Sequence, residues 1–368
     1  MSGTTAKRIR VVIVDDSSVM RILLRDLLAQ DPRIEVVGSA VDPFYAKDVI
    51  RQLRPDVVTL DVEMPRMDGV TFLGKLMRFH PVPVVMVSTH TDAGTDAALR
   101  ALERGAVDVI AKPTDTSADA LKRYAAALTR KIVDAAATKD TVERLSTRQA
   151  EMNTLSGTAL EPMDRRAQPF ARPGVRVVAM GGSTGAPQAL RRLLRHFPSD
   201  TPGTLIAIHL PGRFVESFVQ RLDDVTVMRT QVAQDGHPIE QGNIYLAPGD
   251  QHLVIEERAG ELRCRLHRME KVHGFRPSVD VLFDSIATLG PGAAAVLLTG
   301  MGKDGAQGLL RIHQAGGYTI AQDEASSVVW GMPGAAVAAG GAQDVVPLER
   351  IAAVLCGRDR QARQRAIA

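Results

Sequence analysis

Residues 175–187 read VRVVAMGGSTGAP, an apolar run that ends in glycines and hydroxyl side chains. Two later stretches have the same form, TLIAIHLPGRF at 204–214 and AAAVLLTGMGKDGAQG at 293–308. Continuous apolar runs separated by helical patterns are typical of a parallel sheet that is covered on both faces. If the three runs are neighbouring strands, then Ser183, His209 and Asp304 meet at the carboxyl edge of the sheet, where open α/β folds bind ligands.

Serine, histidine and aspartate are the residue types of a nucleophilic triad, which is recognised by geometry and not by chain order. Ser183 comes just before a predicted helix with Pro187 in its first turn, so helix N–H groups would favour an anion there. A plainer interpretation of each residue alone stays open. Ser183 or Thr184 could be an N-cap, Asp304 could cap the helix that follows it, and His209 could be structural.

The glycines around Ser183 do not form a dinucleotide or phosphate loop. Their spacing does not fit GxGxxG, no Walker lysine follows, and the strand predicted in TLIAIHL at 204–210 ends in His209 where a ribose-binding acid would be expected. The GxSxG elbow of ordinary α/β-hydrolases is also missing. These observations favour a hydrolase of another kind.

The first third of the chain predicts a separate α/β domain. From residue 9 to about 135, strand and helix patterns alternate five times, with strands predicted at 9–16, 35–40, 56–61, 82–89 and 108–113. The runs are rich in Val and Ile, as in a doubly wound parallel sheet.

Acidic side chains follow the strands of this first domain. Asp15 and Asp16 end the first strand and Asp61 ends the third, so three carboxylates converge at one edge and require a cation. Oxygen-only ligands suit Mg²⁺. With the charge of Lys112 and the hydroxyl of Ser88, this set is suited to phosphoryl transfer. The alternative is that these acids only cap helices.

The motifs VDDS, LDVEMPRMDG, MVST and AKP resemble, in order and spacing, those of response-regulator receiver domains. The resemblance implies that Asp61 accepts a phosphoryl group from the phosphohistidine of a partner kinase. It also implies that Asp15, Asp16 and Asp61 bind Mg²⁺, and that Ser88 and Lys112 contact the phosphoryl oxygens. Receivers often have an aromatic residue shortly before the lysine, but here the preceding residues are VIA.

The second domain resembles the catalytic domain of the chemotaxis protein-glutamate methylesterases. The matching motifs, in order, are GGSTGAP, HLPGRFVESFVQRL, IYLAPGDQHL, RPSVDVLFDSIA, LLTGMGKDGAQGLL and TIAQDEASSVVWGMP. The resemblance implies that Ser183 is the nucleophile, His209 the general base and acid, and Asp304 the residue that orients His209. The backbone N–H groups of Met301 and of the Thr184 region would hold the oxyanion.

The two resemblances together imply a phosphorylation-activated enzyme of chemotaxis adaptation. Its substrates would be the glutamyl methyl esters of methyl-accepting chemoreceptors, with deamidation of selected receptor glutamines as a second activity. A chemotaxis histidine kinase would be the phosphodonor, and the phosphorylated receiver would relieve inhibition of the esterase. Mg²⁺ is expected for receiver phosphorylation, and no cofactor is expected for the esterase step.

The expected organisation is two doubly wound α/β domains, a five-stranded receiver and a larger esterase domain. We expect the receiver at residues 8–137, a flexible linker at 138–173 and the catalytic domain at 174–358. The linker is rich in Thr, Ser, Arg and Gln and contains three prolines, so it buries little apolar surface.

Composition narrows the remaining classes. Across 368 residues, 45 Lys and Arg balance 42 Asp and Glu to a net charge of +3, and no basic patch or helix-turn-helix pattern indicates nucleic-acid binding. No apolar run reaches membrane-spanning length, so no membrane insertion is expected. Only two cysteines occur, which favours a reduced, cytoplasmic setting. The main alternative is a response regulator whose second domain binds without catalysis.

Overall fold

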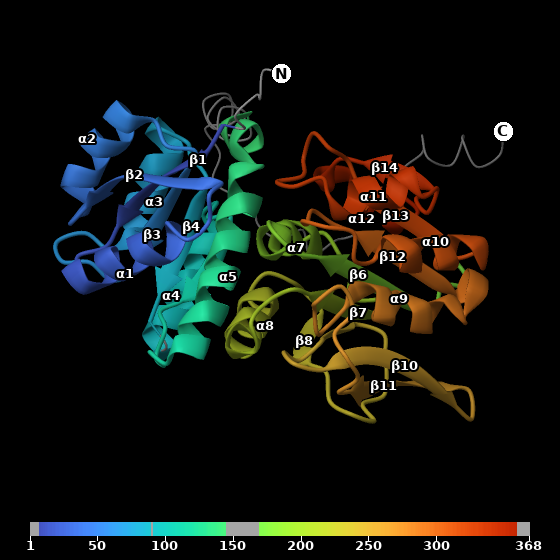
Figure 1. The fold of residues 1–368 in the computed structure, drawn as a ribbon. Helices are drawn as coiled ribbons and strands as arrows, with labels where there is room; N and C mark the ends of the chain where they lie inside the picture. The colour runs from blue at the N-terminus through green and yellow to red at the C-terminus, as the bar shows by residue number, and fades with distance from the viewer. Residues whose placement is uncertain (1–6, 90, 145–168, 359–368) are drawn as a thin grey trace, which may run out of the picture. The chain divides into compact units, whose positions relative to one another are not determined.

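The computed structural model describes residues 7–89, 91–144 and 169–358. The chain divides between Gly157 and Thr158 into two compact units, coloured blue to teal and green to red in Figure 1. Most of the predicted linker, residues 145–168, lies outside the described residues. In the part of the chain that is described, no helix is both long and apolar enough to cross a membrane.

The first unit is a five-stranded parallel sheet, as predicted, and the structure gives its strand order as β2-β1-β3-β4-β5. Helices α1 and α5 pack together, and α2, α3 and α4 pack in series (Figure 1). The elements are β1 Ile9–Val14, α1 Ser18–Leu28, β2 Ile34–Ala40, α2 Pro43–Leu53, β3 Val57–Asp61, α3 Gly69–Phe79, β4 Val84–Ser88, α4 Asp92–Glu103, β5 Asp108–Ala111 and α5 Ala118–Ala136.

Local sequence explains where these elements begin and how tightly they pack. Ser17 caps α1 by accepting a hydrogen bond from Met20 N, and Asp42 caps α2 just before Pro43. Every residue of β3 and β4 is buried, which accounts for their unbroken apolar sequence. Gly69 is required at the start of α3, because a Cβ atom there would lie 1.9 Å from the carbonyl oxygen of Asp61.

The first unit continues past the predicted receiver boundary. Residues 139–144 are helical, and Val142 is buried in the same apolar core as Val11 and Leu128. Lys139 forms an ion pair with Asp56 at 2.7 Å. The start of the predicted linker is therefore packed on the receiver.

The second unit is built on a seven-stranded sheet. Its elements are β6 Val177–Gly182, α7 Ala186–Leu194, β7 Gly203–Ile208, η1 Gly212–Phe214, α8 Val215–Asp223, β8 Arg229–Val232, β9 Asn243–Leu246, β10 His252–Arg258, β11 Glu261–His267, α9 Val279–Ala287, η2 Gly290–Gly292, β12 Ala293–Leu297, α10 Ala306–Gln314, β13 Tyr318–Gln322, α11 Met332–Ala338, β14 Asp344–Val346 and α12 Leu348–Leu355. Helices α7, α8 and α12 pack in one group and α9, α10 and α11 in another (Figure 1).

This sheet confirms the predicted neighbouring strands. Its order is β14-β13-β12-β6-β7-β9-β8, and every pairing is parallel. Strands β12, β6 and β7 are therefore adjacent at the centre. The carboxyl ends of these three strands carry Asp304, Ser183 and His209.

An antiparallel hairpin, β10 and β11, was not predicted from the sequence. It is closed by a two-residue turn, Ala259 and Gly260, both with positive φ. Leu253, Leu262 and Cys264 on the hairpin are buried in the core of the second unit. The hairpin thus completes the core on the side of α9, which it contacts.

The end of the predicted linker is packed on the second unit. Ala171 N donates to Cys356 O at 2.9 Å, and the Arg172 guanidinium lies 3.2 Å from the ring centroid of Tyr318. Arg172 also donates to the carbonyls of Val354 and Leu355 at the end of α12. Such contacts between distant residues leave no signal in the composition of the segment.

Candidate active site and candidate phosphorylation site

Ser183 follows the last residue of β6 and precedes α7. Its N–H donates to Thr299 O at 3.0 Å, which ties it to the loop after β12. Its side chain is half-buried. The α7 amino terminus begins three residues later at Ala186, whose N–H donates back to Ser183 O. Ser183 is thus presented on a tight turn between a strand and a helix.

The structure excludes the two helix-capping alternatives. The N-cap of α7 is Gly185, not Ser183 or Thr184, and the N-cap of α10 is Gly305, not Asp304. Both glycines have positive φ, 81° and 86°, a conformation that side chains other than glycine rarely adopt. The polar side chains before them are therefore not used as N-caps of these two helices.

His209 follows β7 and is hydrogen-bonded to Asp304. The Nε2 atom lies 2.8 Å from Asp304 Oδ2, and the two side chains are 4% and 1% exposed. Because an ionised carboxylate only accepts hydrogen bonds, Nε2 carries the proton and Nδ1 has the lone pair. Among the described residues, Nδ1 is buried and has no hydrogen-bond partner. The ring is therefore held through Nε2, and Nδ1 is free to accept a proton.

The Asp304 carboxylate packs against the amino terminus of α9, a helix that comes earlier in the chain. Its Oδ1 accepts from Ser278 Oγ at 2.8 Å and Asp280 N at 2.9 Å, and its Oδ2 accepts from Val279 N at 2.8 Å. Burial opposes ionisation, but the hydrogen bond from His209 and these backbone N–H groups outweigh it and hold the pKa of Asp304 below its ordinary value. A buried carboxylate is therefore stable here in its ionised form.

Sequence reasoning missed the residues that support Asp304. Ser278 is the N-cap of α9, and a serine two residues before an acid is a recognisable helix start within RPSVDVLFDSIA. That signal does not indicate which distant side chain the helix start would bind. Phe275, whose ring stacks on His209, was also missed, because nothing local marks a half-buried phenylalanine as part of a site.

The candidate oxyanion donors lie on two loops that touch. A Cβ atom on Gly300 would lie 2.8 Å from Ser183 N, so the loops after β12 and β6 are in close contact. Thr299 Oγ1 joins them by donating to Thr184 O at 2.9 Å. Within the described ranges, the backbone N–H groups of Thr184 and Met301 have no protein acceptor. Both remain available to donate to a ligand.

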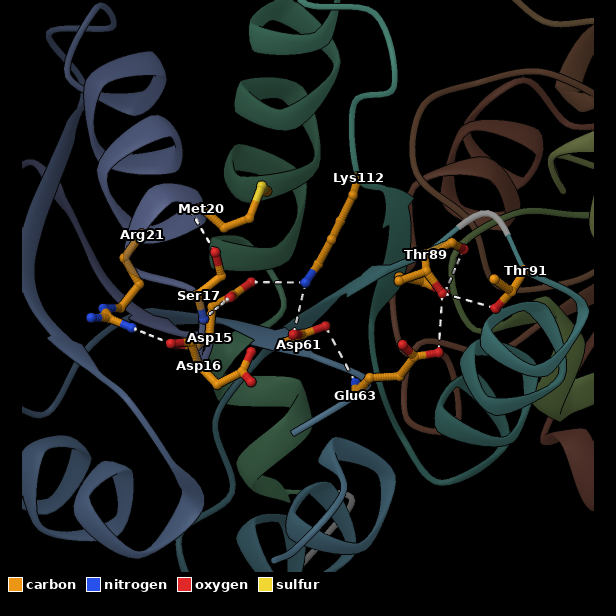
Figure 2. Close-up of polar contacts among 11 residues, drawn as sticks. Asp15, Asp16, Ser17, Met20, Arg21, Asp61, Glu63, Thr89, Thr91 and Lys112 are labelled. Carbon is orange, nitrogen blue, oxygen red and sulfur yellow. Dashed lines mark hydrogen bonds and ion pairs between the residues drawn. The ribbon is translucent and has the colours of Figure 1, made fainter. Parts of the chain in front are cut away.

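The acidic cluster of the first unit forms as predicted (Figure 2). Oxygens of Asp15, Asp16 and Asp61 all lie within 4.8 Å of one another. Lys112 Nζ lies 2.8 Å from Asp61 Oδ2 and 3.2 Å from Asp15 Oδ2. Strands β1 and β3 are neighbours, so their carboxyl ends bring these residues together.

The charges in this cluster fit a divalent cation. Burial raises the pKa of Asp61 to about 6; the charge of Asp15 adds to this and Lys112 opposes it. Burial also raises the pKa of Asp15, again against Lys112. The buried Asp15 Oδ2 has no hydrogen-bond partner among the described residues, despite its ion pair with Lys112. Three oxygen ligands on an open edge are a typical Mg²⁺ site.

Ser88 lies at the end of β4, beside the acidic cluster. It is fully buried, and its Oγ donates to the carbonyl of Thr89 at 3.2 Å. The Thr89 hydroxyl in turn donates to Glu63 at 3.1 Å (Figure 2). A pocket of about 640 Å³ opens over the cluster, lined by Asp16, Asp61, Val62, Glu63, Met64, Pro65, Asp68, Ala97, Arg100 and Lys112.

A receiver-type acidic site on one α/β unit, and a Ser, His and Asp set at the sheet edge of another, define a response regulator with a hydrolase-like second domain. Comparison with known families agrees with both halves. Residues 11–124 match the response regulator receiver domain and residues 178–355 match the CheB methylesterase family. The chain belongs to the chemotaxis protein-glutamate methylesterase/protein-glutamine glutaminase family.

Three relatives cover nearly the whole chain, and each is named a protein-glutamate methylesterase/protein-glutamine glutaminase. The Hahella chejuensis protein is 49% identical over 96% of this chain and 97% of its own length. The Xanthomonas campestris protein is 49% identical over 96% and 98%. The Pseudomonas aeruginosa protein is 47% identical over 94% and 96%. Membership of this family rules out two alternative functions, a second domain that binds without catalysis and a DNA-binding regulator.

Proposed function

We propose that the protein hydrolyses glutamyl methyl esters on methyl-accepting chemoreceptors, releases methanol, and deamidates selected receptor glutamines. The observation that carries the proposal is the adjacency of β12, β6 and β7, whose carboxyl ends bear Asp304, Ser183 and His209. A phosphorylated receiver raises this activity, and a chemotaxis histidine kinase supplies the phosphoryl group. Partners of this kind imply a cytoplasmic location.

In the proposed mechanism, Ser183 Oγ attacks the ester carbonyl while His209 Nδ1 takes its proton. The imidazolium then protonates the departing methoxide, which leaves as methanol, and an acyl-enzyme remains. Water attacks the acyl-enzyme with His209 again as base, which releases the glutamate carboxylate and restores the serine. A glutamine follows the same route and releases ammonia. The hydrogen bond to Asp304 supports this assignment because it fixes the tautomer that leaves Nδ1 as the base.

The backbone N–H groups of Thr184 and Met301 are the proposed donors to the oxyanion. Donors of this type each contribute about 3 kcal/mol to stabilisation of a tetrahedral intermediate in acyl transfer. Their lack of protein acceptors in the described residues, and the contact between their loops, support this role. The esterase step proposed here uses only protein groups and water.

The receiver chemistry uses the acidic cluster. Asp15, Asp16 and Asp61 would hold Mg²⁺, which when bound neutralises charge on the phosphoryl group. Asp61 is the proposed acceptor, with Lys112 and the Ser88 hydroxyl contacting the phosphoryl oxygens. The ion pairs of Lys112 support its placement at this group.

We assign residues 8–137 to the receiver, 138–173 to the linker and 174–358 to the catalytic domain. Packing of Val142 in the receiver core and of Arg172 on Tyr318 indicates that both ends of the linker adhere to the domain beside them.

Methanol release from a methylated chemoreceptor tests the proposed function. We expect release by the full chain, increased by acetyl phosphate together with Mg²⁺. Receptor incubated without the protein is the control for spontaneous hydrolysis. Release that never exceeds this control, with or without the phosphodonor, would contradict the proposal.

Asp61→Asn is expected to block phosphorylation and to leave basal methanol release unchanged. The amide cannot form the acyl phosphate, and the esterase residues lie in the other unit. The measurement is transfer of radiolabel from a phosphorylated kinase, with Asp26→Asn, an exposed carboxylate of α1, as the matched control. Removal of Mg²⁺ by EDTA should suppress labelling of the unaltered protein to a similar degree. Normal labelling of the Asp61 variant would assign the acceptor elsewhere.

A further inference from the structure

The ring of Phe275 covers one face of the His209 imidazole. The ring centroids are 3.6 Å apart and the planes differ by 3°. Carbon atoms in optimal contact lie about 3.5 Å apart. Nearly all of the centroid distance is therefore vertical, and the two rings overlap almost completely.

This face-to-face arrangement suits a charged histidine better than a neutral one. Neutral aromatic pairs prefer offset or edge-to-face packing, because face-to-face rings bring their negative faces together. A cation over a ring face is attracted to it. In the proposed mechanism His209 is a cation only after it takes the proton of Ser183. The stack is thus most favourable in the state that precedes departure of methanol.

The backbone holds Phe275 in a tight turn. Val272 N donates to Phe275 O at 3.1 Å and Phe275 N donates to Val272 O at 2.9 Å. The two residues between them, His273 and Gly274, have φ of 53° and 83°, as in the two-residue turns of hairpins. The position of Phe275 is therefore set by paired backbone groups on both sides of its Cα atom.

Side chains on either side of Phe275 fix the turn to the rest of the unit. His273 Nε2 lies 3.0 Å from Asp280 Oδ2, on the helix whose first N–H groups bind Asp304. The Arg276 guanidinium donates to Asp250 at 2.6 Å and to Met269 O at 2.8 Å. The turn that carries Phe275 and the carboxylate that orients His209 are therefore held by one framework.

We propose that Phe275 is a positioning residue of the esterase, which holds the His209 ring with Nε2 on Asp304 and stabilises its imidazolium form. This inference rests on the proposed function. Stabilisation that exists only when the ring is charged lowers the barrier without tightening substrate binding, so it acts on kcat and not on KM.

The test compares three variants of the full chain. Phe275→Leu keeps an apolar side chain but removes the ring, and Phe275→Tyr keeps the ring. Phe283→Leu makes the same change at a buried position of α9 as a control for lost packing. Each is assayed on methylated receptor and on p-nitrophenyl acetate, whose small size removes any effect on receptor docking. Circular dichroism checks the fold, and Phe275→Met replaces the leucine variant if that variant unfolds.

We expect Phe275→Leu to lower kcat about tenfold on both substrates, which corresponds to about 1.4 kcal/mol, with KM changed less than about twofold. Phe275→Tyr and Phe283→Leu should stay within about twofold of the unaltered kcat. An unchanged kcat in Phe275→Leu, or an equal loss in Phe275→Tyr, would overturn the proposal. Ser183→Ala separates the proposed mechanism from the proposed role of Phe275. If Ser183→Ala remains active, the mechanism is wrong. If Ser183→Ala is inactive and Phe275→Leu has normal activity, only the role of Phe275 is wrong.

Discussion

Ser183→Ala is expected to lower methanol release from methylated receptor by at least on the order of 10³-fold, with the fold retained. The alanine has no atom that can form the acyl-enzyme, and the N–H donors of Thr184 and Met301 cannot replace a nucleophile. His209→Ala should be nearly as severe. Because triad members act as a unit, the double variant should be little worse than either single one.

The measurement is initial methanol release with circular dichroism spectra of each variant. Ser199→Ala, an exposed serine of the same unit, is the matched control and should retain full activity. Losses that multiply in the double variant would contradict the assignment of Ser183 and His209 to one chemical step.

Asp304→Asn is expected to reduce both activity and stability. The carboxylate accepts four hydrogen bonds, two on each oxygen, from His209, Val279 N, Ser278 Oγ and Asp280 N. Either orientation of an amide places its NH₂ group against donors. Donors left unpaired in a buried site cost about 1–3 kcal/mol. If NH₂ faces His209, the ring proton moves to Nδ1 and the base is lost, at a cost on the order of 10⁴-fold in turnover.

The unaltered protein should lose stability when Asp304 is protonated at low pH. The folded-state pKa lies below the ordinary value, so the unfolded chain binds this proton more readily. The contribution of Asp304 is therefore fully present above about pH 4 and is lost as the pH falls through the folded-state pKa. Urea unfolding from pH 7 to pH 3 measures this effect.

The difference in unfolding free energy between Asp304→Asn and the unaltered protein should narrow below about pH 4. Asp284→Asn, which removes a partly exposed ion pair between α9 and Arg311 of α10, should cost no more than about 1 kcal/mol. A difference for the Asp304 variant that stays constant down to pH 3 would show that its carboxylate is not preferentially ionised in the folded state.

The sequence alone was enough to predict the strands and their polar ends. Apolar runs that end in Asp61, Ser183, His209 and Asp304 are local patterns, and strands of one parallel sheet must share a carboxyl edge. Burial on both faces leaves a continuous Val and Ile signal, so a parallel sheet was predicted correctly for each unit, with five strands in the first and three central neighbours in the second. The hairpin β10 and β11 was missed because alternation along its strands is weaker, with one face partly exposed.

Only the tertiary structure decided what surrounds the proposed catalytic residues. The hydrogen bond between His209 and Asp304 joins positions 95 residues apart, and the α9 N–H groups that bind Asp304 lie 24 and 25 residues before it. Helix starts, tight turns and phenylalanines are common, and their local sequences do not encode which distant group they will contact. The position of Phe275 on His209, and the choice of Nδ1 as the free nitrogen, follow from how a turn, a helix terminus and a sheet edge pack together.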